Sequence, residues 1–248
     1  MLAINNRNGL NALKTVNKIE IFEIKYILLH PKNKIKFHDE IISEITDKSI
    51  ILYWEKSNRT EIQKKAQNEG LDLLLSVNFG YIFKHNFLEC FKEKINLHTS
   101  YLPYNRGAHP NVWPIIDGTP AGVTLHTMDA EIDKGKIIYQ EEVKVEETDT
   151  GKTLYEKLEE RSVEVFRKGL VGYYHNEIVP FIPKEVGTYH SHQDFVDLFE
   201  VDLNEKIKTG DFLRRLRALS FPPFKNAYYQ TTENEKINID ISIARKKE

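Results

Sequence analysis

The sequence predicts an α/β protein with a doubly wound, mostly parallel sheet and a small C-terminal extension that ends in a β-hairpin. Three observations predict this fold class. Short apolar runs alternate with segments of helical spacing through the first half of the chain, which is the pattern of repeated βαβ units. The run 71–77 is almost continuously apolar, as expected for a strand buried on both faces. The chain closes with two strand-like segments joined by a polar turn.

Strands and helices alternate in the first half of the chain. Ser57 and Asn58 can cap one of these helices and Gly70 can end it. The alternation predicts a Rossmann-like sheet, whose ligands bind beyond the carboxyl ends of the strands. The expected strands span 2–4, 24–29, 50–54 and 71–77, and the expected helices span 10–14, 37–45 and 59–69.

Longer elements are expected in the second half. A helix should occupy 152–174, because the polar residues 148–150 can cap it and apolar residues recur along one face. The other expected elements are a short helix at 87–93, strands at 95–100 and 136–143, a basic helix at 208–218, and strands at 226–232 and 237–244.

The last expected strand alternates strictly. Ile237, Ile239, Ile241 and Ile243 are separated by polar or small residues, so one face of the strand is all isoleucine. A two-stranded hairpin is marginal in water, and an exposed face of this kind would adhere to other surfaces. We therefore expect the hairpin to pack on a second copy of the chain and to form a homodimer.

The composition argues against several classes of partner. Lys and Arg total 35 against 37 Asp and Glu, so no basic field would attract a nucleic acid. Cys90 is the only cysteine and no Cys/His group has zinc-ligand spacing, so we expect neither a disulfide nor a metal. The N-terminus lacks the pattern of a signal peptide, and no apolar run reaches the roughly 20 residues of a membrane span. We expect a cytoplasmic protein with no membrane partner.

The region 95–135 carries the candidate chemistry. Asn96 and His98 lie two residues apart in an expected strand, so their side chains leave the same face of the sheet. A loop rich in turn-forming residues follows at 102–114, and Asp133 lies close before a glycine in a second loop. Each residue alone has an ordinary structural role, as a hydrogen-bonded histidine or as a polar residue that caps a turn. Together they could place an amide, an imidazole and a carboxylate in one pocket.

Three other segments could bind ligands. The polar turn 5–9 after the first strand offers backbone N–H groups and Arg7 to an anion, although an ordinary βα turn explains it as well. The turn Phe79-Gly80-Tyr81 can bring the backbone close to a flat ring, or it can simply end a strand. The basic helix 208–218 and the aromatic segment 219–229 could hold a nucleotide, or they could be a solvated helix with packing aromatics.

The order of these motifs is specific. The succession Asn-x-His-x-Ser-x-Leu-Pro, Arg-Gly and Asp-x-Gly resembles the folate-dependent formyltransferases, strongly over 77–143 and weakly over the N-terminal βα units. The resemblance implies that Asn96, His98 and Asp133 are catalytic and that 10-formyltetrahydrofolate is the formyl donor. It also implies a folate pocket formed by Phe79, Gly80, Tyr81, Arg106, Gly107, Asp129, Ala130, Glu131 and Ile132.

The chemistry of the three residues agrees with this role. Formyl transfer needs a neutral amine as nucleophile, a group that accepts its proton, and stabilisation of an oxyanion. Asn96 can donate its amide N–H to that oxyanion. His98 can be a second donor or the proton acceptor, and Asp133 can bias the charge of His98 or orient the amine proton. The route of the proton between His98 and Asp133 stays open.

The sequence motifs identify the formyl acceptor less clearly than the formyl donor. The chain is most similar to sugar N-formyltransferases of the dTDP-4-amino-4,6-dideoxyglucose type, through Leu-Arg-Ala-Leu at 216–219, Phe-Pro-Pro-Phe at 221–224 and the terminal hairpin. This resemblance implies a dTDP-linked amino-dideoxyhexose as substrate, used for a surface polysaccharide, and leaves the amine at C3 or C4. The candidate substrate contacts are Arg7, Asn8, Tyr189, His190, Arg217, Phe221 and Tyr228.

Three alternatives remain at this point. Glycinamide ribonucleotide transformylases also have a glycine-bearing turn near the N-terminus. Methionyl-tRNA formyltransferases are longer, and they carry small residues where this chain has Ala-His-Pro-Asn at 108–111. A non-catalytic folate- or nucleotide-binding protein would not need the three catalytic residues. We expect a catalytic domain at 1–180 and, at 181–248, a segment that binds substrate and dimerises.

Overall fold

The computed structural model describes residues 1–129 and 131–246, and they form two compact units. The first unit comprises Met1–His98, Thr124–Gln140 and Ser162–Pro183. The second unit comprises Thr99–Val123, Glu141–Arg161 and Lys184–Glu248, of which the last two residues lie outside the described part. The expected domain boundary at residue 180 stays a prediction.

The expected alternation of strands and helices is present in the first half of the chain. The elements are β1 (Leu2–Ile4), α1 (Asn6–Val16), β2 (Ile27–Leu29), α2 (His38–Ser43), a 3-10 turn (Lys48–Ile50), β3 (Ile51–Tyr53), α3 (Arg59–Asn68), β4 (Leu73–Val77), α4 (His85–Leu88) and β5 (Glu93–His98). The helix expected at 87–93 was wrong in its position. Glu93 belongs to β5, because its backbone N–H bonds to Asp72 O at the start of the pairing with β4.

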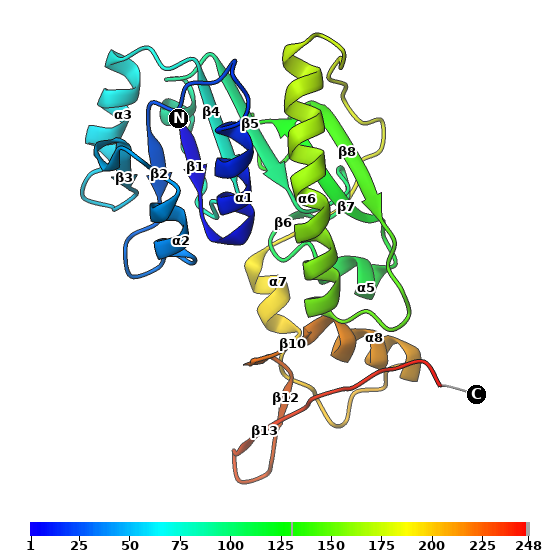
Figure 1. The fold of residues 1–248 in the computed structure, drawn as a ribbon. Coiled ribbons are helices and arrows are strands. Elements are labelled where there is room, and N and C mark those ends of the chain that lie inside the picture. The colour runs from blue at the N-terminus through cyan, green and yellow to red at the C-terminus, as the bar shows by residue number, and fades with distance from the viewer. Residues whose placement is uncertain (130, 247–248) are drawn as a thin grey trace. The chain divides into compact units, whose positions relative to one another are not determined.

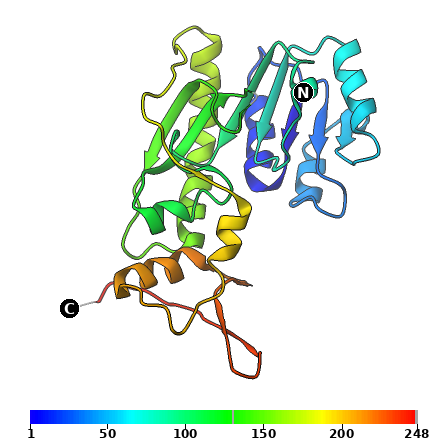
Figure 2. The same ribbon diagram turned by 180° about the vertical axis from the view of Figure 1, so that it is seen from behind.

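A seven-stranded sheet forms the centre of the fold, in the order β3-β2-β1-β4-β5-β7-β8. Its two last strands are β7 (Ala121–Thr127) and β8 (Ile137–Val143). The pairs from β3 to β5 are parallel, and β5 pairs antiparallel with β7. Figures 1 and 2 show β1 inside the sheet, between β2 and β4. The sequence-based prediction of a doubly wound, mostly parallel sheet is confirmed, and the strand order reverses at β1, where such sheets bind ligands.

Strand β7 was not anticipated from the sequence. It runs beside β5 in the register Asn96↔His126 and His98↔Thr124. Thr124 and His126 are polar but only 0% and 1% exposed, so both faces of this strand are buried. Apolar and polar residues alternate at 123–126, but this short pattern does not show that the polar ones are buried.

The two faces of β5 have different neighbours. Leu97 shares a small buried gap with Ala12 of α1 and with Phe166 of the long helix α6 (Gly151–Tyr174), which confirms the helix expected at 152–174. Figure 1 shows α6 running along β7 and β8. Because side chains alternate along a strand, Asn96 and His98 leave the other face of the sheet.

The second unit contains short elements and a terminal hairpin. The basic helix expected at 208–218 is present as α8, whereas α5 and α7 were not expected. The elements are β6 (Arg106–Gly107), α5 (Trp113–Asp117), β9 (Tyr189–His190), α7 (His192–Asp197), α8 (Thr209–Leu219), β10 (Ser220–Phe221), β11 (Phe224–Lys225), β12 (Tyr228–Gln230) and β13 (Lys236–Asn238). In the described part of the chain, no helix is long and apolar enough to cross a membrane.

The terminal hairpin is shorter than expected. β12 and β13 pair antiparallel with Tyr229 opposite Ile237, but β13 ends at Asn238 instead of continuing to 244. Beyond this point Ile239 N bonds to Ala227 O, and up to residue 246 no further strand is formed. Ile237 is 37% exposed, whereas the three later isoleucines are half-buried. The strand stops where the backbone has no second strand to pair with.

Candidate active site

The three residues expected to be catalytic gather in the first unit. Asn96 and His98 lie on β5, and Asp133 lies in the loop between β7 and β8. His98 Nε2 and Asp133 Oδ2 are 3.6 Å apart, and the two side chains are only 11% and 12% exposed. The loop therefore folds back so that its carboxylate meets the imidazole at the carboxyl end of β5. An electrostatic interaction between groups so poorly solvated is far less screened than one at the surface.

A second histidine, which the sequence analysis missed, completes this group. His126 lies on β7 opposite Asn96, and its Nε2 is 3.3 Å from Asn96 Nδ2 and 3.6 Å from Asp133 Oδ1. Its Nδ1 is 2.8 Å from Thr127 O. The side chain is 1% exposed, and burial lowers its pKa to about 4, against a smaller opposing effect of Asp133. His126 is thus a neutral, buried ring at neutral pH.

One signal in the sequence could have indicated this histidine. The segment 121–127 has β-branched or apolar residues at Val123, Leu125 and Thr127, with Thr124 and His126 between them. Once it is read as a strand, His126 falls on the face opposite to Leu125. Only the antiparallel pairing with β5 then brings that face together with Asn96 and His98.

The turn expected to hold the folate ring rests on an aromatic cluster. Phe79, Phe83, Phe87 and Phe91 are spaced by four residues and are all buried, together with Trp54. Phe79 and Phe83 stack at 5.2 Å between ring centroids, and Phe83 and Phe87 at 5.1 Å. Tyr81 and Met128, at the edges of the two loops expected to form the pocket, both pack against this cluster. One core therefore supports both loops.

Side chains from two other segments fix the turn itself. His30, which follows β2, approaches Phe79 O through Nε2, and its ring lies 4.7 Å from the ring of Tyr81. Burial lowers the pKa of His30, so the neutral ring can donate this hydrogen bond. The guanidinium of Arg59 lies over the Tyr81 ring, 5.3 Å from the ring centroid. Gly80 has φ of 73°, a left-handed conformation that suits glycine.

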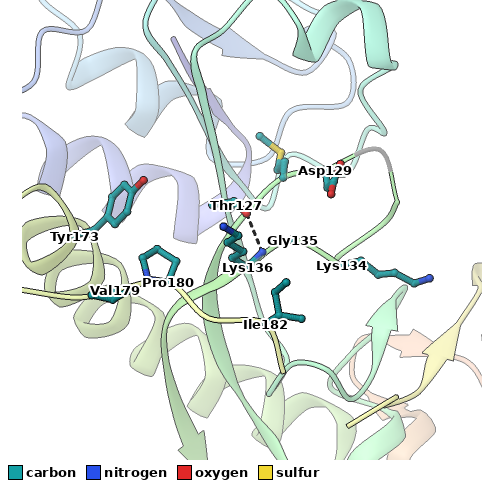
Figure 3. Close-up of a pocket in the computed structure, with 10 residues that line it drawn as sticks. Thr127, Asp129, Lys134, Gly135, Lys136, Tyr173, Val179, Pro180 and Ile182 are labelled. Atoms are coloured by element: carbon teal, nitrogen blue, oxygen red, sulfur yellow. Dashed lines mark hydrogen bonds between the residues drawn. The ribbon is translucent and has the colours of Figure 1, made fainter. Parts of the chain in front are cut away.

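The loop after β7 lies beside a cavity of about 540 Å³, shown in Figure 3. Asp129 and Lys134 are at its rim, and Lys136 N donates to Thr127 Oγ1 at 2.8 Å to close the base of the loop. None of the three catalytic candidates lines this cavity. Glu131 and Ile132 are exposed, and Ala130 lies outside the described residues.

In the second unit the structure pairs two segments that were predicted to bind different ligands. β6 and β9 are parallel, with Arg106 opposite Tyr189 and Gly107 opposite His190. A Cβ on Gly107 would lie 2.3 Å from His190 O, and its φ is 92°, so glycine is required there. The His190 ring stacks on Trp113 with centroids 3.8 Å apart.

The remaining substrate candidates in the second unit have structural partners. Arg217 is 7% exposed, and its guanidinium donates to Asp149 O, Glu146 O and a carboxylate oxygen of Glu147. Phe221 packs edge-on against Tyr155, and Tyr228 is held in the hairpin by its pairing with Asn238. For Arg217 these contacts favour a role in holding the loop before α6, and its contact with substrate stays a prediction.

The two N-terminal candidates differ in access. Arg7 is exposed and lies over the ring of Phe37, 5.4 Å from the centroid. Asn8 is 2% exposed and points toward the buried gap beside Leu97 and α6. Arg7 can therefore reach a ligand in solution, whereas the burial of Asn8 disfavours direct contact.

The group at β5 and β7 can carry out acyl transfer. It combines an amide donor, an imidazole, a carboxylate and a second, neutral imidazole, all poorly solvated. Such a set can stabilise an oxyanion and accept a proton from an amine. Among the residues that the structure describes, no three His, Cys, Asp or Glu side chains are placed to hold a metal ion.

Comparison with known proteins agrees with this chemistry. Residues 19–170 match the family described as "Formyl transferase", and residues 194–245 match the "N-formyltransferase dimerization C-terminal domain". A dTDP-4-amino-4,6-dideoxyglucose formyltransferase of Mycobacterium tuberculosis is 32% identical over 179 residues, which cover 72% of this chain and 76% of that protein.

Solved structures are similar over most of the chain. A 4-N formyltransferase from Francisella tularensis has a TM-score of 0.81 at 29% identity, covering 98% of this chain and 97% of its own. The formyltransferase PseJ from Anoxybacillus kamchatkensis has a TM-score of 0.53 at 29% identity, covering 77% of this chain and 96% of its own. It was solved with UDP-4,6-dideoxy-4-formamido-L-AltNAc and tetrahydrofolate. The chain therefore belongs to the formyl transferase family and is an N-formyltransferase enzyme.

Proposed function

We propose that this enzyme transfers the formyl group of 10-formyltetrahydrofolate to the amino group of a dTDP-linked amino-dideoxyhexose, with dTDP-4-amino-4,6-dideoxyglucose as the acceptor. The observation that carries the proposal is the convergence of Asn96, His98 and Asp133 at the end of β5, where His98 Nε2 lies 3.6 Å from Asp133 Oδ2. The product would be a formamido sugar for a surface polysaccharide.

Each of the three side chains has a defined task in this reaction. Asn96 donates an N–H to the formyl oxygen, which gains negative charge as the amine attacks the formyl carbon. His98 and Asp133 face each other and together take up the proton that the amine must lose. Their low exposure strengthens these interactions, because little water competes for the same groups.

The described residues fit a folate donor. The turn 79–81 offers backbone groups at Gly80 and the half-buried ring of Tyr81, and Ile132 presents an apolar side chain that is 38% exposed. A flat, partly polar ring needs this combination of backbone hydrogen bonds and apolar contact. The donor supplies the formyl group, and the relative PseJ was solved with tetrahydrofolate.

Two relatives support the choice of acceptor. The mycobacterial enzyme, at 32% identity, acts on dTDP-4-amino-4,6-dideoxyglucose by its name, and the Francisella structure is a 4-N formyltransferase. In the second unit, the exposed ring of Tyr189 and the stacked ring of His190 are proposed to contact the nucleotide-linked sugar. The contact of Arg7 with substrate stays a prediction.

The C-terminal part is proposed to dimerise through its hairpin. The match to an N-formyltransferase dimerization domain covers 194–245 and includes β12 and β13. Ile237 and the half-buried isoleucines after it lie on the segment that forms no further strand in one chain. A second copy would supply the missing strand partner and cover this apolar side.

The acceptor is tested with a substrate panel. The purified protein is incubated with 10-formyltetrahydrofolate and, separately, with dTDP-4-amino-4,6-dideoxyglucose, its 3-amino isomer, glycinamide ribonucleotide and charged initiator tRNA. Mass spectrometry of each acceptor should find a formyl group only on the 4-amino sugar. Product on glycinamide ribonucleotide or tRNA alone would refute the sugar assignment, and product on the 3-amino sugar alone would move the site of transfer.

A catalytic control accompanies the panel. His98→Ala should lower kcat by at least about a hundredfold, because general acid–base catalysis contributes at this scale. If folded His98→Ala still binds donor and acceptor but reacts at the wild-type rate, the catalytic assignment of His98 is lost. No formylation of any acceptor by folded wild-type protein would favour a non-catalytic binding protein.

A further inference from the structure

We propose that His126 is a positioning residue: it fixes the orientation of the Asn96 amide so that one N–H of Asn96 is presented to the oxygen of the transferred formyl group. The proposal rests on the proposed function for its link to the formyl group. It starts from the placement of the buried His126 ring against Asn96 Nδ2 at 3.3 Å across the β5–β7 pair.

The backbone decides which nitrogen of His126 carries the proton. Nδ1 lies 2.8 Å from Thr127 O, and a carbonyl oxygen can only accept a hydrogen bond. The proton of the neutral ring therefore sits on Nδ1. Nε2 is left with its lone pair, and it can only accept.

This tautomer determines the orientation of Asn96. The lone pair on Nε2 attracts the NH₂ group of the Asn96 amide and repels its carbonyl oxygen. The amide orientation with Nδ2 toward His126 is therefore favoured. One N–H of Asn96 is then committed to His126. The second N–H is held in the plane of the amide, and a donor fixed in advance is worth more than one that must reorient during the reaction.

Protonation of His126 would undo this arrangement. The titratable groups that face its ring are Asp133, with Oδ1 3.6 Å from Nε2, and His98, whose Nε2 lies 3.6 Å from the other oxygen of the same carboxylate. A proton on Nε2 would turn this nitrogen into a donor toward Asp133 and would repel the NH₂ of Asn96. Burial opposes that proton, so Asp133 stays available to His98.

The test compares two substitutions with one control. His126→Gln keeps an acceptor for Asn96 and a donor for Thr127 O, whereas His126→Leu removes both. Leu125→Ala is the control, since Leu125 is a buried neighbour that points to the opposite face of β7. Steady-state kinetics with the formyl donor and the accepted amine should show kcat of His126→Leu reduced by about a hundredfold, as for loss of an oxyanion donor, with KM nearly unchanged.

The conservative and control variants decide between positioning and packing. His126→Gln should recover at least about tenfold of the lost kcat, and folded Leu125→Ala should keep the wild-type kcat despite lower stability. Equal kcat losses in both His126 variants would overturn the proposal, and so would an unchanged kcat in His126→Leu.

A second measurement does not depend on activity. Nuclear magnetic resonance of wild-type protein labelled with ¹⁵N-histidine reports which ring nitrogen carries the proton. The His126 signal, assigned by its absence from His126→Gln, should show a protonated Nδ1 and a bare Nε2 at neutral pH. The opposite tautomer, or a charged ring, would overturn the positioning role even if the enzyme formylates a sugar, and the proposed function would be unaffected.

Discussion

At the scale of single residues, the site depends on a carboxylate that lies between two imidazoles. Asp133 reaches His98 through one oxygen and His126 through the other, both at 3.6 Å. Only one of these rings is kept neutral by complete burial. The two oxygens of the carboxylate therefore face different rings: His98, which can take a proton, and His126, whose Nε2 accepts a hydrogen bond from Asn96 and not from the carboxylate.

Replacing the Asp133 carboxylate by an amide tests the effect of its charge while keeping the size of the side chain. Asp133→Asn keeps the size of the side chain but cannot stabilise a protonated His98, so kcat should fall by about a hundredfold or more. Stopped-time product assays with saturating donor and acceptor measure the change. Asp39→Asn, at a side chain that is 99% exposed, is the matched control and should keep the wild-type rate. A wild-type kcat in Asp133→Asn would contradict the role given to this carboxylate.

The turn at Gly80 is a second residue-scale case. Gly80→Ala puts a side chain at φ of 73°, which costs about 1 kcal/mol and brings a methyl group to 3.7 Å from the His30 ring. We expect lower stability and a several-fold higher KM for the formyl donor. Gly70→Ala is a matched control, with φ of 57° and nothing within 4 Å of the added Cβ. It should lose similar stability with no change in KM, and a shift in KM for both variants would show that strain alone causes it.

At the scale of elements, β7 has the largest consequence. It is the antiparallel strand in a sheet whose pairs are parallel from β3 to β5, and its register places His126 beside Asn96. Antiparallel pairing carries the chain from the carboxyl end of β5 toward its start, where Thr127 lies opposite Ile95, and the loop that follows folds back to bring Asp133 to His98. Strand β7, which was not predicted from the sequence, is the element that brings the groups of the site together.

The terminal hairpin carries a prediction about assembly. The variant Ile239→Lys with Ile241→Lys should weaken the dimer, because two charges would have to be buried where apolar side chains pack. Light scattering across a range of protein concentrations measures the mass of wild type and variant. Val179→Lys is the control, since Val179 is 83% exposed in the first unit and should leave the mass unchanged. A monomeric wild type, or a variant as dimeric as the wild type, would contradict the hairpin interface.

At the scale of the whole molecule, the buried histidines make stability depend on pH. The folded protein holds the pKa of His126 at about 4, below its ordinary value of 6.5, because burial disfavours the charged ring. The unfolded chain therefore binds this proton first as the pH falls. The stability present above pH 6.5 is lost as the pH falls toward 4, by up to roughly 3 kcal/mol for this group.

A variant isolates this contribution from the other titrating groups. Urea unfolding of wild type and of His126→Gln at several values from pH 7 to pH 4 gives the difference in unfolding free energy at each pH. That difference should shrink as the pH falls, since the variant has no ring to protonate. His109, whose pKa is also lowered to about 4 by burial and by His192, is common to both proteins and cancels. A difference that stays constant with pH would contradict the neutral, buried state of His126.

Many of the helices and strands could be predicted from the sequence because they depend on residues that are close together in the chain. Alternation of apolar runs with helical spacing depends on neighbouring residues, and it predicted the first four strands of the sheet and α6. The side-chain parity of β5 needs only the two-residue repeat of a strand, and it correctly placed Asn96 and His98 on one face. The ends of elements were less accurate, as at 87–93 and in the last strand, because they depend on which backbone groups find partners.

The sequence by itself determined the chemistry: an amide and an imidazole on one strand face, a carboxylate before a glycine, and an order of motifs that resembles formyltransferases. The tertiary structure alone decided which groups meet. It paired β7 with β5, set His126 against Asn96, buried Asn8, and engaged the buried Arg217 in hydrogen bonds to the loop before α6. The physical reason is that the pairing of distant segments and the burial of polar side chains depend on the whole packed chain, which local patterns of hydrophobicity do not specify.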